Sequence, residues 1–211
     1  RAPADANASG PEVYGVPHRD LQQRPTRSSG GEMSELNSPF ARLLQEQVSH
    51  EFTAQQQYVA LAVWFDARDL PQLAGFYYRQ ALEERNHAMM IVQYLLDRDI
   101  PPRIPGISEV RNDFGSPTEM VALALAQEEQ VTAQIEALFF KAARDEGDFL
   151  GEQFILWFLK EQVEEVASMK TLLTICERAG SDYFKIEDFV ARETGSEAED
   201  PSAPSAAGGA L

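Results

Sequence analysis

Apolar side chains recur with the roughly 3.6-residue period of an α-helix along four long stretches of the chain. In the first stretch Leu44, Val48, Ala62 and Phe65 fall on one side of such a helix. A shorter stretch with the same pattern follows the fourth. The predicted helices cover about residues 38–66, 71–98, 116–144, 149–179 and 183–192. The pattern therefore predicts an all-α fold.

The boundaries of these helices carry their own signals. Ser38-Pro39 and Ser116-Pro117 each combine a capping hydroxyl with a proline at the first helical position, and Gly180 is a suitable C-terminal cap. Residues 99–116 contain three prolines and Gly106, so this segment cannot be helical throughout. It is long enough to cross the length of a bundle. We expect a four-helix bundle with one long crossover, followed by a short fifth helix.

The two ends of the chain differ from this middle part. Residues 1–37 and 194–211 are rich in Ala, Pro, Gly and Ser and lack apolar periodicity. We interpret residues 1–37 as a disordered N-terminal extension, with Met33 as the expected native start, and residues 194–211 as a flexible tail. Residues 38–193 then form the folded domain.

Composition restricts the partners of the chain. The net charge is -16, which would repel nucleic acid and anionic membranes and attract cations. No apolar run approaches the roughly 20 residues that span a bilayer. Cys176 is the single cysteine, which excludes an intramolecular disulfide and fits a reducing, cytoplasmic compartment.

Acidic residues lie within the apolar stripes of all four long helices. Glu84 and His87 are three residues apart, so both can reach one metal ion from one side of a helix. Glu51 interrupts the stripe of the first helix. The third helix offers Glu128 and Glu129, of which only one can face inward because helical neighbours point about 100° apart. The fourth helix contributes the run from Glu161 to Glu165, including Gln162. Carboxylates are costly to bury unless paired or metal-bound, so this pattern indicates a two-metal carboxylate centre suited to iron, and also to manganese or zinc.

These motifs resemble those of the non-haem ferritins of bacteria from Asn37 to about Arg192. The matching motifs are His50-Glu51-Phe52 with Tyr58, Glu83-Glu84-Arg85-Asn86-His87, Glu129-Gln130 and Glu161-Gln162-Val163-Glu164-Glu165. The resemblance implies a ferritin-like four-helix bundle. It also implies a first iron site formed by Glu51, Glu84 and His87.

The resemblance assigns further site residues. Glu84 would bridge to a second iron site completed by Glu129 and Glu165, with Gln162 adjacent. The residues that resemble a third site, through which iron passes inward, are Glu83, Glu161, Glu164 and Glu165. Tyr58 occupies the place of a tyrosine that supplies an electron when oxygen is reduced.

The implied function is iron storage and detoxification. Fe(II) would be oxidised to Fe(III) by oxygen or peroxide, and ferric mineral would be stored in a shell of 24 identical subunits. No haem is predicted, because Gln162-x-x-Glu165 stands where haem-containing bacterioferritins carry a second Glu-x-x-His. Asn86 replaces the usual glutamate of the second-helix motif, which is expected to cost one accessory carboxylate.

Alternatives remain open from the residues alone. A di-iron oxidoreductase acting on peroxide or an organic substrate predicts a substrate pocket. A non-catalytic bundle predicts an incomplete ligand set, and a twelve-subunit cage protecting DNA predicts iron between subunits. Glu146, Asp148 and Glu152 are candidates for a cation-entry pore, and the C-terminal tail could address the protein to a larger protein shell.

Overall fold

The computed structural model describes residues 38–194 and 200–211, so the predictions for residues 1–37 and for Met33 lie outside the described residues. Secondary structure within the described ranges is entirely helical. The elements are α2 (Pro39–Asp66), α3 (Pro71–Asp97), α4 (Pro117–Phe140), the π-helix η1 (Lys141–Asp145), α5 (Phe149–Ala179) and α6 (Tyr183–Glu193). The four long helices and the short fifth helix predicted from the sequence are confirmed. None of the described helices is both long and apolar enough to cross a membrane.

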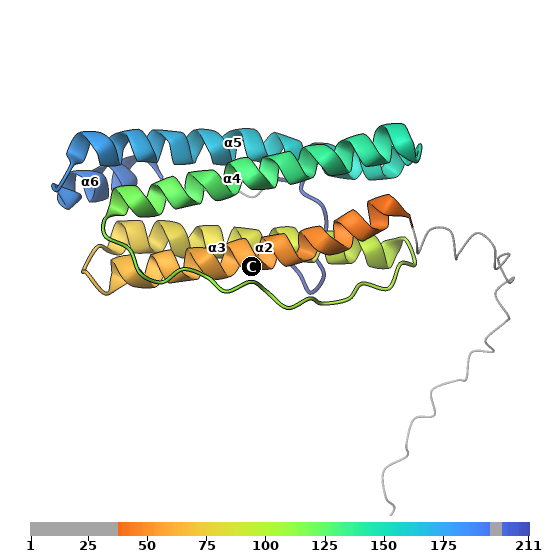
Figure 1. The fold of residues 1–211 in the computed structure, drawn as a ribbon, viewed down its shortest axis with the longest axis horizontal. Coiled ribbons are helices and arrows are strands. Elements are labelled where there is room, and N and C mark those ends of the chain that lie inside the picture. Colours follow the sequence, from red (N-terminus) through yellow and green to blue (C-terminus); the bar gives the residue numbers. More distant parts are fainter. Residues whose placement is uncertain (1–37, 195–199) are drawn as a thin grey trace, which may run out of the picture.

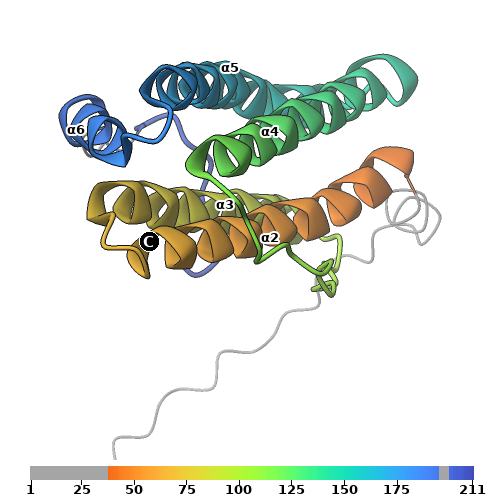
Figure 2. The ribbon, with the colours of Figure 1, turned by 60° about the vertical axis from the view of Figure 1, so that its left-hand side comes forward.

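The long helices form a four-helix bundle built from two pairs (Figure 1). Helices α2 and α3 pack together as one antiparallel pair, and α4 and α5 form the other. The segment between α3 and α4 runs the length of the bundle alongside α2, and α6 lies at one end against α3 and α5 (Figure 2). The predicted bundle with a single long crossover is therefore confirmed.

A polar stripe on α2 holds the crossover in place. Gln45, Ser49 and Gln57 are spaced at multiples of four along this helix, so they share a face. The Gln57 amide accepts from the Arg111 backbone N–H at 2.9 Å and donates to the Arg111 carbonyl at 2.8 Å. Ser49 Oγ donates to the Gly106 carbonyl at 3.0 Å, and Gln45 Oε1 accepts from the backbone N–H of Arg103 at 2.8 Å. These side chains satisfy backbone groups that an irregular segment cannot pair by itself.

The helix starts use both local and distant caps. Ser38 Oγ accepts the Ala41 N–H at 3.0 Å, as the sequence predicted. At the start of α3 the cap residue is Leu70, which has no side-chain acceptor. Glu187 of α6 supplies it instead, because its two carboxylate oxygens accept the N–H groups of Gln72 and Leu73 at 2.9 and 2.7 Å. A carboxylate at a helix N-terminus is favourable, so α6 completes α3 while packing against it.

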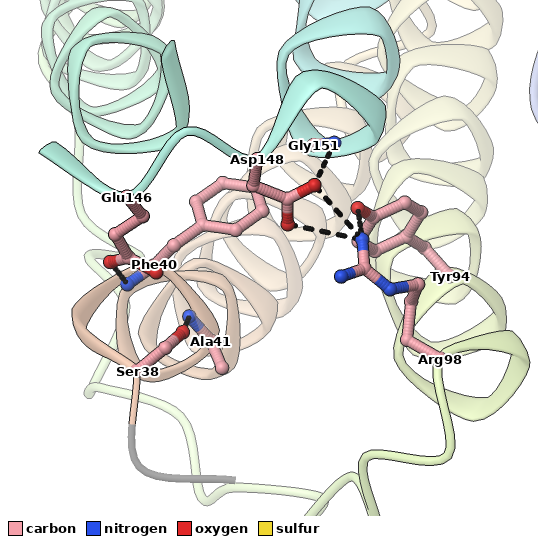
Figure 3. Close-up of polar contacts among 8 residues, drawn as sticks. All are labelled: Ser38, Phe40, Ala41, Tyr94, Arg98, Glu146, Asp148 and Gly151. Carbon is pink, nitrogen blue, oxygen red and sulfur yellow. Dashed lines mark hydrogen bonds and ion pairs between the residues drawn. The ribbon is translucent and has the colours of Figure 1, made fainter. Parts of the chain in front are cut away.

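The junction between α4 and α5 differs from the sequence prediction. The α-helix ends at Phe140 and continues as η1 to Asp145 instead of running on as one helix. Asp148 then caps α5 through the Gly151 N–H at 2.9 Å and pairs with Arg98 of α3 at 3.0 Å (Figure 3). Glu146 accepts the backbone N–H of Phe40. Two of the three candidate pore carboxylates are therefore engaged in contacts within the subunit.

Two apolar clusters fill the bundle on either side of a polar middle. One contains Leu44, Val48, Ile91, Leu95, Ile135 and Ile155, and the other contains Leu61, Phe65, Leu73, Tyr77, Met120, Leu172 and Cys176. On each long helix, buried polar residues lie between the residues of these two clusters: Glu51 on α2, Glu84 and His87 on α3, Glu128 on α4, and Gln162 and Glu165 on α5. The polar site is thus placed near mid-bundle. Cys176 is fully buried, and burial raises the pKa of its thiol to about 12, so it is a core residue.

The C-terminal segment 200–211 differs from the flexible tail expected from its composition. It lies against α3 and α5, with the Ala207 N–H donating to the Met89 carbonyl at 3.0 Å. Asn86 accepts the Leu211 N–H and donates to the Leu211 carbonyl, both at 3.2 Å. Asp200 accepts from Trp157 Nε1 at 3.2 Å and pairs with Lys160 at 3.0 Å. Hydrogen bonds and an ion pair with α3 and α5 therefore hold this segment in place, although its own sequence has no apolar periodicity.

Candidate metal centre

All four long helices place acidic or amide side chains in the middle of the bundle. The buried members are Glu51 on α2, Glu84 and His87 on α3, Glu128 on α4, and Gln162 and Glu165 on α5, and none is more than 8% exposed. Burying several carboxylates together costs free energy unless something neutralises them. The structure therefore brings five of the six expected catalytic residues together, counting Tyr58, which is fully buried nearby.

Glu51, Glu84 and His87 form the tightest group. Each offers one ligand atom, and these atoms all lie within 4.8 Å of one another. Glu84 Oε2 is 3.5 Å from His87 Nδ1, and the i, i+3 spacing of the two residues on α3 produces this proximity. The His87 ring is held edge-on by Trp157 and Phe158, with centroids 5.7 and 5.6 Å away. This geometry matches the first iron site expected from the sequence.

Three carboxylate oxygens in the cluster have no hydrogen-bond partner. They are Glu51 Oε2, Glu84 Oε2 and Glu128 Oε2, and all are buried. An unsatisfied buried polar atom costs about 1–3 kcal/mol, and more when the group is charged. Carboxylate oxygens of Glu51 and Glu84 close to an imidazole, with Glu128 as a further neighbour of Glu84, suit a divalent cation such as iron, manganese or zinc. The donor set therefore fits the metal centre that the sequence predicted.

The raised pKa values of the clustered carboxyl groups also favour a bound cation. Burial raises the pKa of Glu84 well above its ordinary value, and the neighbouring Glu128 and Glu51 raise it further. Burial also raises the pKa of Glu128 to about 7, although a hydrogen bond from Tyr58 opposes this shift. The carboxylates thus repel one another without a cation. A bound cation would reverse this repulsion and favour their ionised forms.

The structure places Glu129, the predicted third-helix ligand, outside the cluster. The Glu129 side chain is 54% exposed and forms an ion pair with Lys170 at 3.3 Å. Its neighbour Glu128 is fully buried and lies in the cluster. The sequence did contain the deciding signal: Ala124, Glu128 and Ile135 continue one buried stripe of α4, and Glu129 is turned about 100° away from it.

Neutral hydrogen-bond donors surround Glu128. The Tyr58 hydroxyl donates to Glu128 Oε1, and the Gln162 amide forms a second hydrogen bond to this carboxylate. Thr132 Oγ1 donates to Gln162 Oε1 and to the Glu128 carbonyl, both at 2.8 Å. Since Thr132 occupies the Gln162 oxygen, the amide NH₂ is the group that faces Glu128. Thr132 was missed from the sequence because its role depends on a residue of another helix.

The residues expected for a third site are brought together only in part. Glu165 is buried within the cluster, and Glu83 is half-buried, where it accepts from Gln80 Nε2 at 2.7 Å. Glu161 is also half-buried, and burial raises the pKa of its carboxyl. Glu164 lies on the exposed face of α5. The structure therefore places Glu165 in the cluster, Glu161 and Glu83 at its half-buried edge, and Glu164 on the surface.

Comparisons with known proteins agree with this fold and site. The chain matches the sequence profile of the ferritin-like domain over residues 41–179. It is 63% identical over 176 residues to Ferritin BfrB of Mycolicibacterium smegmatis, which covers 83% of this chain and 97% of that protein. It is 58% identical over 182 residues to Bacterioferritin BfrB of Mycobacterium tuberculosis, which covers 85% of this chain and all 100% of that protein.

More distant proteins share the fold. A bacterial non-heme ferritin of Staphylococcus aureus is 34% identical over 147 residues, covering 70% of this chain and 88% of its own. The open pore ferritin of the archaeon Archaeoglobus fulgidus superposes with a TM-score of 0.70 at 24% identity, over 75% of this chain and 97% of that chain. This last likeness supports the fold alone. The profile match spans all four helices that carry the acidic cluster, and the chain belongs to the ferritin family.

Proposed function

We propose that this chain is a ferroxidase subunit of a bacterial non-haem ferritin, which oxidises Fe(II) and stores the ferric product. Membership of the ferritin family supports iron storage. The observation that carries the ferroxidase proposal is the group of Glu51, Glu84 and His87, whose ligand atoms lie within 4.8 Å of one another in the middle of the bundle. The buried Oε2 atoms of Glu51, Glu84 and Glu128 have no hydrogen-bond partner, which supports it. In this proposal Glu51, Glu84 and His87 hold one Fe(II), and Glu84, Glu128 and Glu165 hold a second.

The remaining polar residues prepare the carboxylates for Fe(II). The hydrogen bonds from Tyr58 and Gln162 favour the ionised form of Glu128, which is the form that binds a cation. Two Fe(II) ions held by shared carboxylates together supply the two electrons that reduce oxygen to hydrogen peroxide, or peroxide to water. Tyr58 lies beside this centre as the candidate donor of a further electron. Fe(III) would then leave past Glu161 and Glu164 toward the interior of the shell.

Several finer assignments belong to the same proposal. A shell of 24 subunits and a cytoplasmic location follow from the family resemblance. A non-haem type is supported by Gln162 and Glu165 in the fourth helix, where a second Glu-x-x-His would otherwise stand. Packaging inside a larger protein shell remains a prediction, and the contacts of residues 200–211 with α3 and α5 favour a role within the subunit.

The main alternative is a di-iron oxidoreductase with an organic or peroxide substrate. Such an enzyme needs a substrate cavity that opens onto the metal centre. The cavity of about 680 Å³ is lined by residues at the bundle end such as Tyr94, Arg98 and Asp148. A second cavity, of about 570 Å³, is lined by α3, α5 and the C-terminal segment, including Trp157 and Pro204. Neither of these two cavities is lined by the carboxylates of the cluster.

Iron loading separates the two functions. Fe(II) is added aerobically to metal-free protein, the protein is passed over a size-exclusion column, and iron is counted per chain in the eluted particle. A large particle with far more iron than the roughly two ions of a di-metal centre supports storage. A small particle that stops near two ions contradicts it. The Glu84→Ala variant, folded by circular dichroism, should lose rapid oxidation, and a wild-type rate in this variant would reject the assigned centre.

A further inference from the structure

Gln47 is a buried polar residue of α2 that has no role in the metal centre proposed above. Its side chain is 2% exposed and lies one helical turn before Glu51. Gln47 Nε2 donates a hydrogen bond of 2.8 Å to Glu51 Oε1, while Glu51 Oε2 has no hydrogen-bond partner. The amide therefore fixes one oxygen of this carboxylate and leaves the other free.

His50 contacts the other end of the Gln47 amide. An ionised carboxylate can only accept hydrogen bonds, so the NH₂ group of Gln47 must be the end that faces Glu51. The carbonyl oxygen of Gln47 then faces Nδ1 of His50, at 3.3 Å. The Gln47 oxygen can only accept, so this contact is a hydrogen bond in the His50 tautomer that carries its hydrogen on Nδ1. The sequence pattern had assigned no role to His50, and this contact supplies one.

The same arrangement occurs at the carboxylate on the opposite helix. Glu128 accepts from Tyr58 through Oε1 and leaves Oε2 without a partner, and Gln162 beside it is held in turn by Thr132. Glu51 and Glu128 are thus each bonded by neutral donors and each keep an Oε2 atom without a hydrogen-bond partner. Neutral donors suit this purpose, since a lysine or arginine at the same place would compete with the metal for the negative charge.

We propose that Gln47 is a positioning residue for Glu51, and that His50 holds the Gln47 amide in the orientation this requires. This proposal rests on the metal centre proposed above. Hydrogen bonds that orient a metal ligand commonly change metal affinity by about 10- to 100-fold when removed. Without Gln47 the Glu51 side chain can rotate, so the first metal position should bind more weakly while the bundle stays folded.

Co(II) is the probe for the test, because its visible absorption reports the geometry of its ligands. Metal-free wild type, Gln47→Met and Gln45→Met are titrated with Co(II), and binding is followed by absorption and calorimetry. Methionine keeps the length of glutamine but cannot donate. Gln45 is the matched control, since it lies on the same helix and binds only the crossover. We expect Gln47→Met to weaken Co(II) binding at one position per chain by about tenfold or more and to change its spectrum, with Gln45→Met unchanged.

His50→Ala tests the second half of the proposal, and its first measurement, in the wild-type background, does not depend on the fold of the Gln47 variant. In the wild-type background it should weaken Co(II) binding severalfold. In the Gln47→Met background it should add nothing, because the amide it orients is gone. An equal loss in both backgrounds would overturn the role of His50. Wild-type binding by Gln47→Met would overturn the role of Gln47, whereas failure of the wild type itself to bind Co(II) would reject the proposed metal centre.

Discussion

The phenol of Tyr58 on α2 donates a hydrogen bond to the carboxylate of Glu128 on α4, 70 positions further along the chain. Both side chains are fully buried. Burial raises the pKa of the Tyr58 phenol well above its ordinary value, with Glu128 adding to the effect, so the phenol remains a donor at neutral pH. The bond in turn lowers the pKa of Glu128 against the effect of burial. The hydroxyl proton of Tyr58, a candidate redox residue, therefore links this residue to Glu128, a candidate metal ligand.

Replacing Tyr58 by Phe should weaken metal binding by way of Glu128. Without the hydrogen bond, the carboxyl holds its proton to higher pH, and a proton must be released before a cation can bind. A hydrogen bond to a charged group contributes about 1.5–3 kcal/mol, which corresponds to roughly a 10- to 100-fold loss of affinity. Co(II) titrations between pH 5.5 and 8 should show the binding midpoint displaced to higher pH.

Tyr77→Phe is the matched control for this change. Tyr77 is also fully buried, and its ring centroid is 5.7 Å from that of Tyr58, but its hydroxyl has no hydrogen-bond partner. Removing an unpartnered hydroxyl should leave metal binding unchanged and should not lower the free energy of unfolding. If the two variants bound Co(II) equally well, the coupling between Tyr58 and Glu128 would have no functional consequence.

Glu128 and Glu129 provide a test of the corrected ligand assignment. Glu128→Gln should abolish Co(II) binding at the second metal position and should stabilise the metal-free protein, since it removes one buried negative charge from a repelling group. Glu129→Gln removes only an exposed ion pair with Lys170, which is worth about 0–1 kcal/mol. Binding stoichiometry measured by calorimetry distinguishes the two variants. Loss of a site in Glu129→Gln, with Glu128→Gln intact, would restore the original choice.

The contrast between Glu128 and Glu129 indicates which parts of the fold and the site can be predicted from the sequence alone. Helix boundaries were predictable because their signals are local, as with the hydroxyl of Ser38 and the proline that follows it. Glu51, Glu84 and His87 were predictable because the spacing within each helix puts them on buried faces. Glu129 is predicted from a motif, whereas the buried stripe that includes Ala124 and Ile135 contains Glu128.

Other features could not be predicted because they depend on contacts between distant segments. The cap that Glu187 places on α3 requires the packing position of α6. The support that Thr132 gives to Gln162 requires the register of α4 against α5. The order of residues 200–211 comes from groups on α3 and α5 and not from their own composition. Local periodicity carries no information on any of these three relationships.

The buried carboxylates should make the metal-free protein more stable in mild acid than in mild alkali. The pKa values of Glu84 and Glu128 are raised in the folded state, so the folded chain binds more protons than the unfolded chain. The resulting stability is complete below the unfolded pKa near 4.5 and is lost as pH rises through the folded pKa. For Glu128, with a folded pKa of about 7, the loss is about 3 kcal/mol between pH 4.5 and 7.

Thermal unfolding in the presence of a chelator checks this pH dependence. The unfolding midpoint of the wild type should be higher at pH 5.5 than at pH 8, and Co(II) should reverse the order by neutralising the cluster. Exposed carboxylates with lowered pKa values, such as Asp182, act at lower pH and do not enter this window. Glu128→Gln should flatten the profile. A wild-type midpoint that rises steadily from pH 5.5 to pH 8 without metal would contradict the raised pKa values.

Asn86 departs from the glutamate usual in its motif, and its contacts with Leu211 suggest why an amide stands there. The side chain both accepts the Leu211 N–H and donates to the Leu211 carbonyl at 3.2 Å, and a carboxylate cannot do the second. Asn86→Asp should therefore loosen the C-terminal segment. The loss of one hydrogen bond, about 0.5–1.5 kcal/mol, and the gain of a repulsion with the carbonyl should speed proteolysis within residues 200–211 by roughly tenfold.

Asn112→Asp controls for the added charge, because the Asn112 amide bonds only within the crossover, to the Val110 carbonyl at 3.1 Å. Its C-terminal segment should be cleaved at the wild-type rate. Trp157 provides a second measurement, since its indole N–H binds Asp200 and its ring packs against His87. In Asn86→Asp the fluorescence of Trp157 should shift as Asp200 moves away, and the Co(II) spectrum then reports whether His87 follows. Equal cleavage of the two variants would mean that Asn86 does not hold the segment, and that Asp200 and Ala207 suffice to do so.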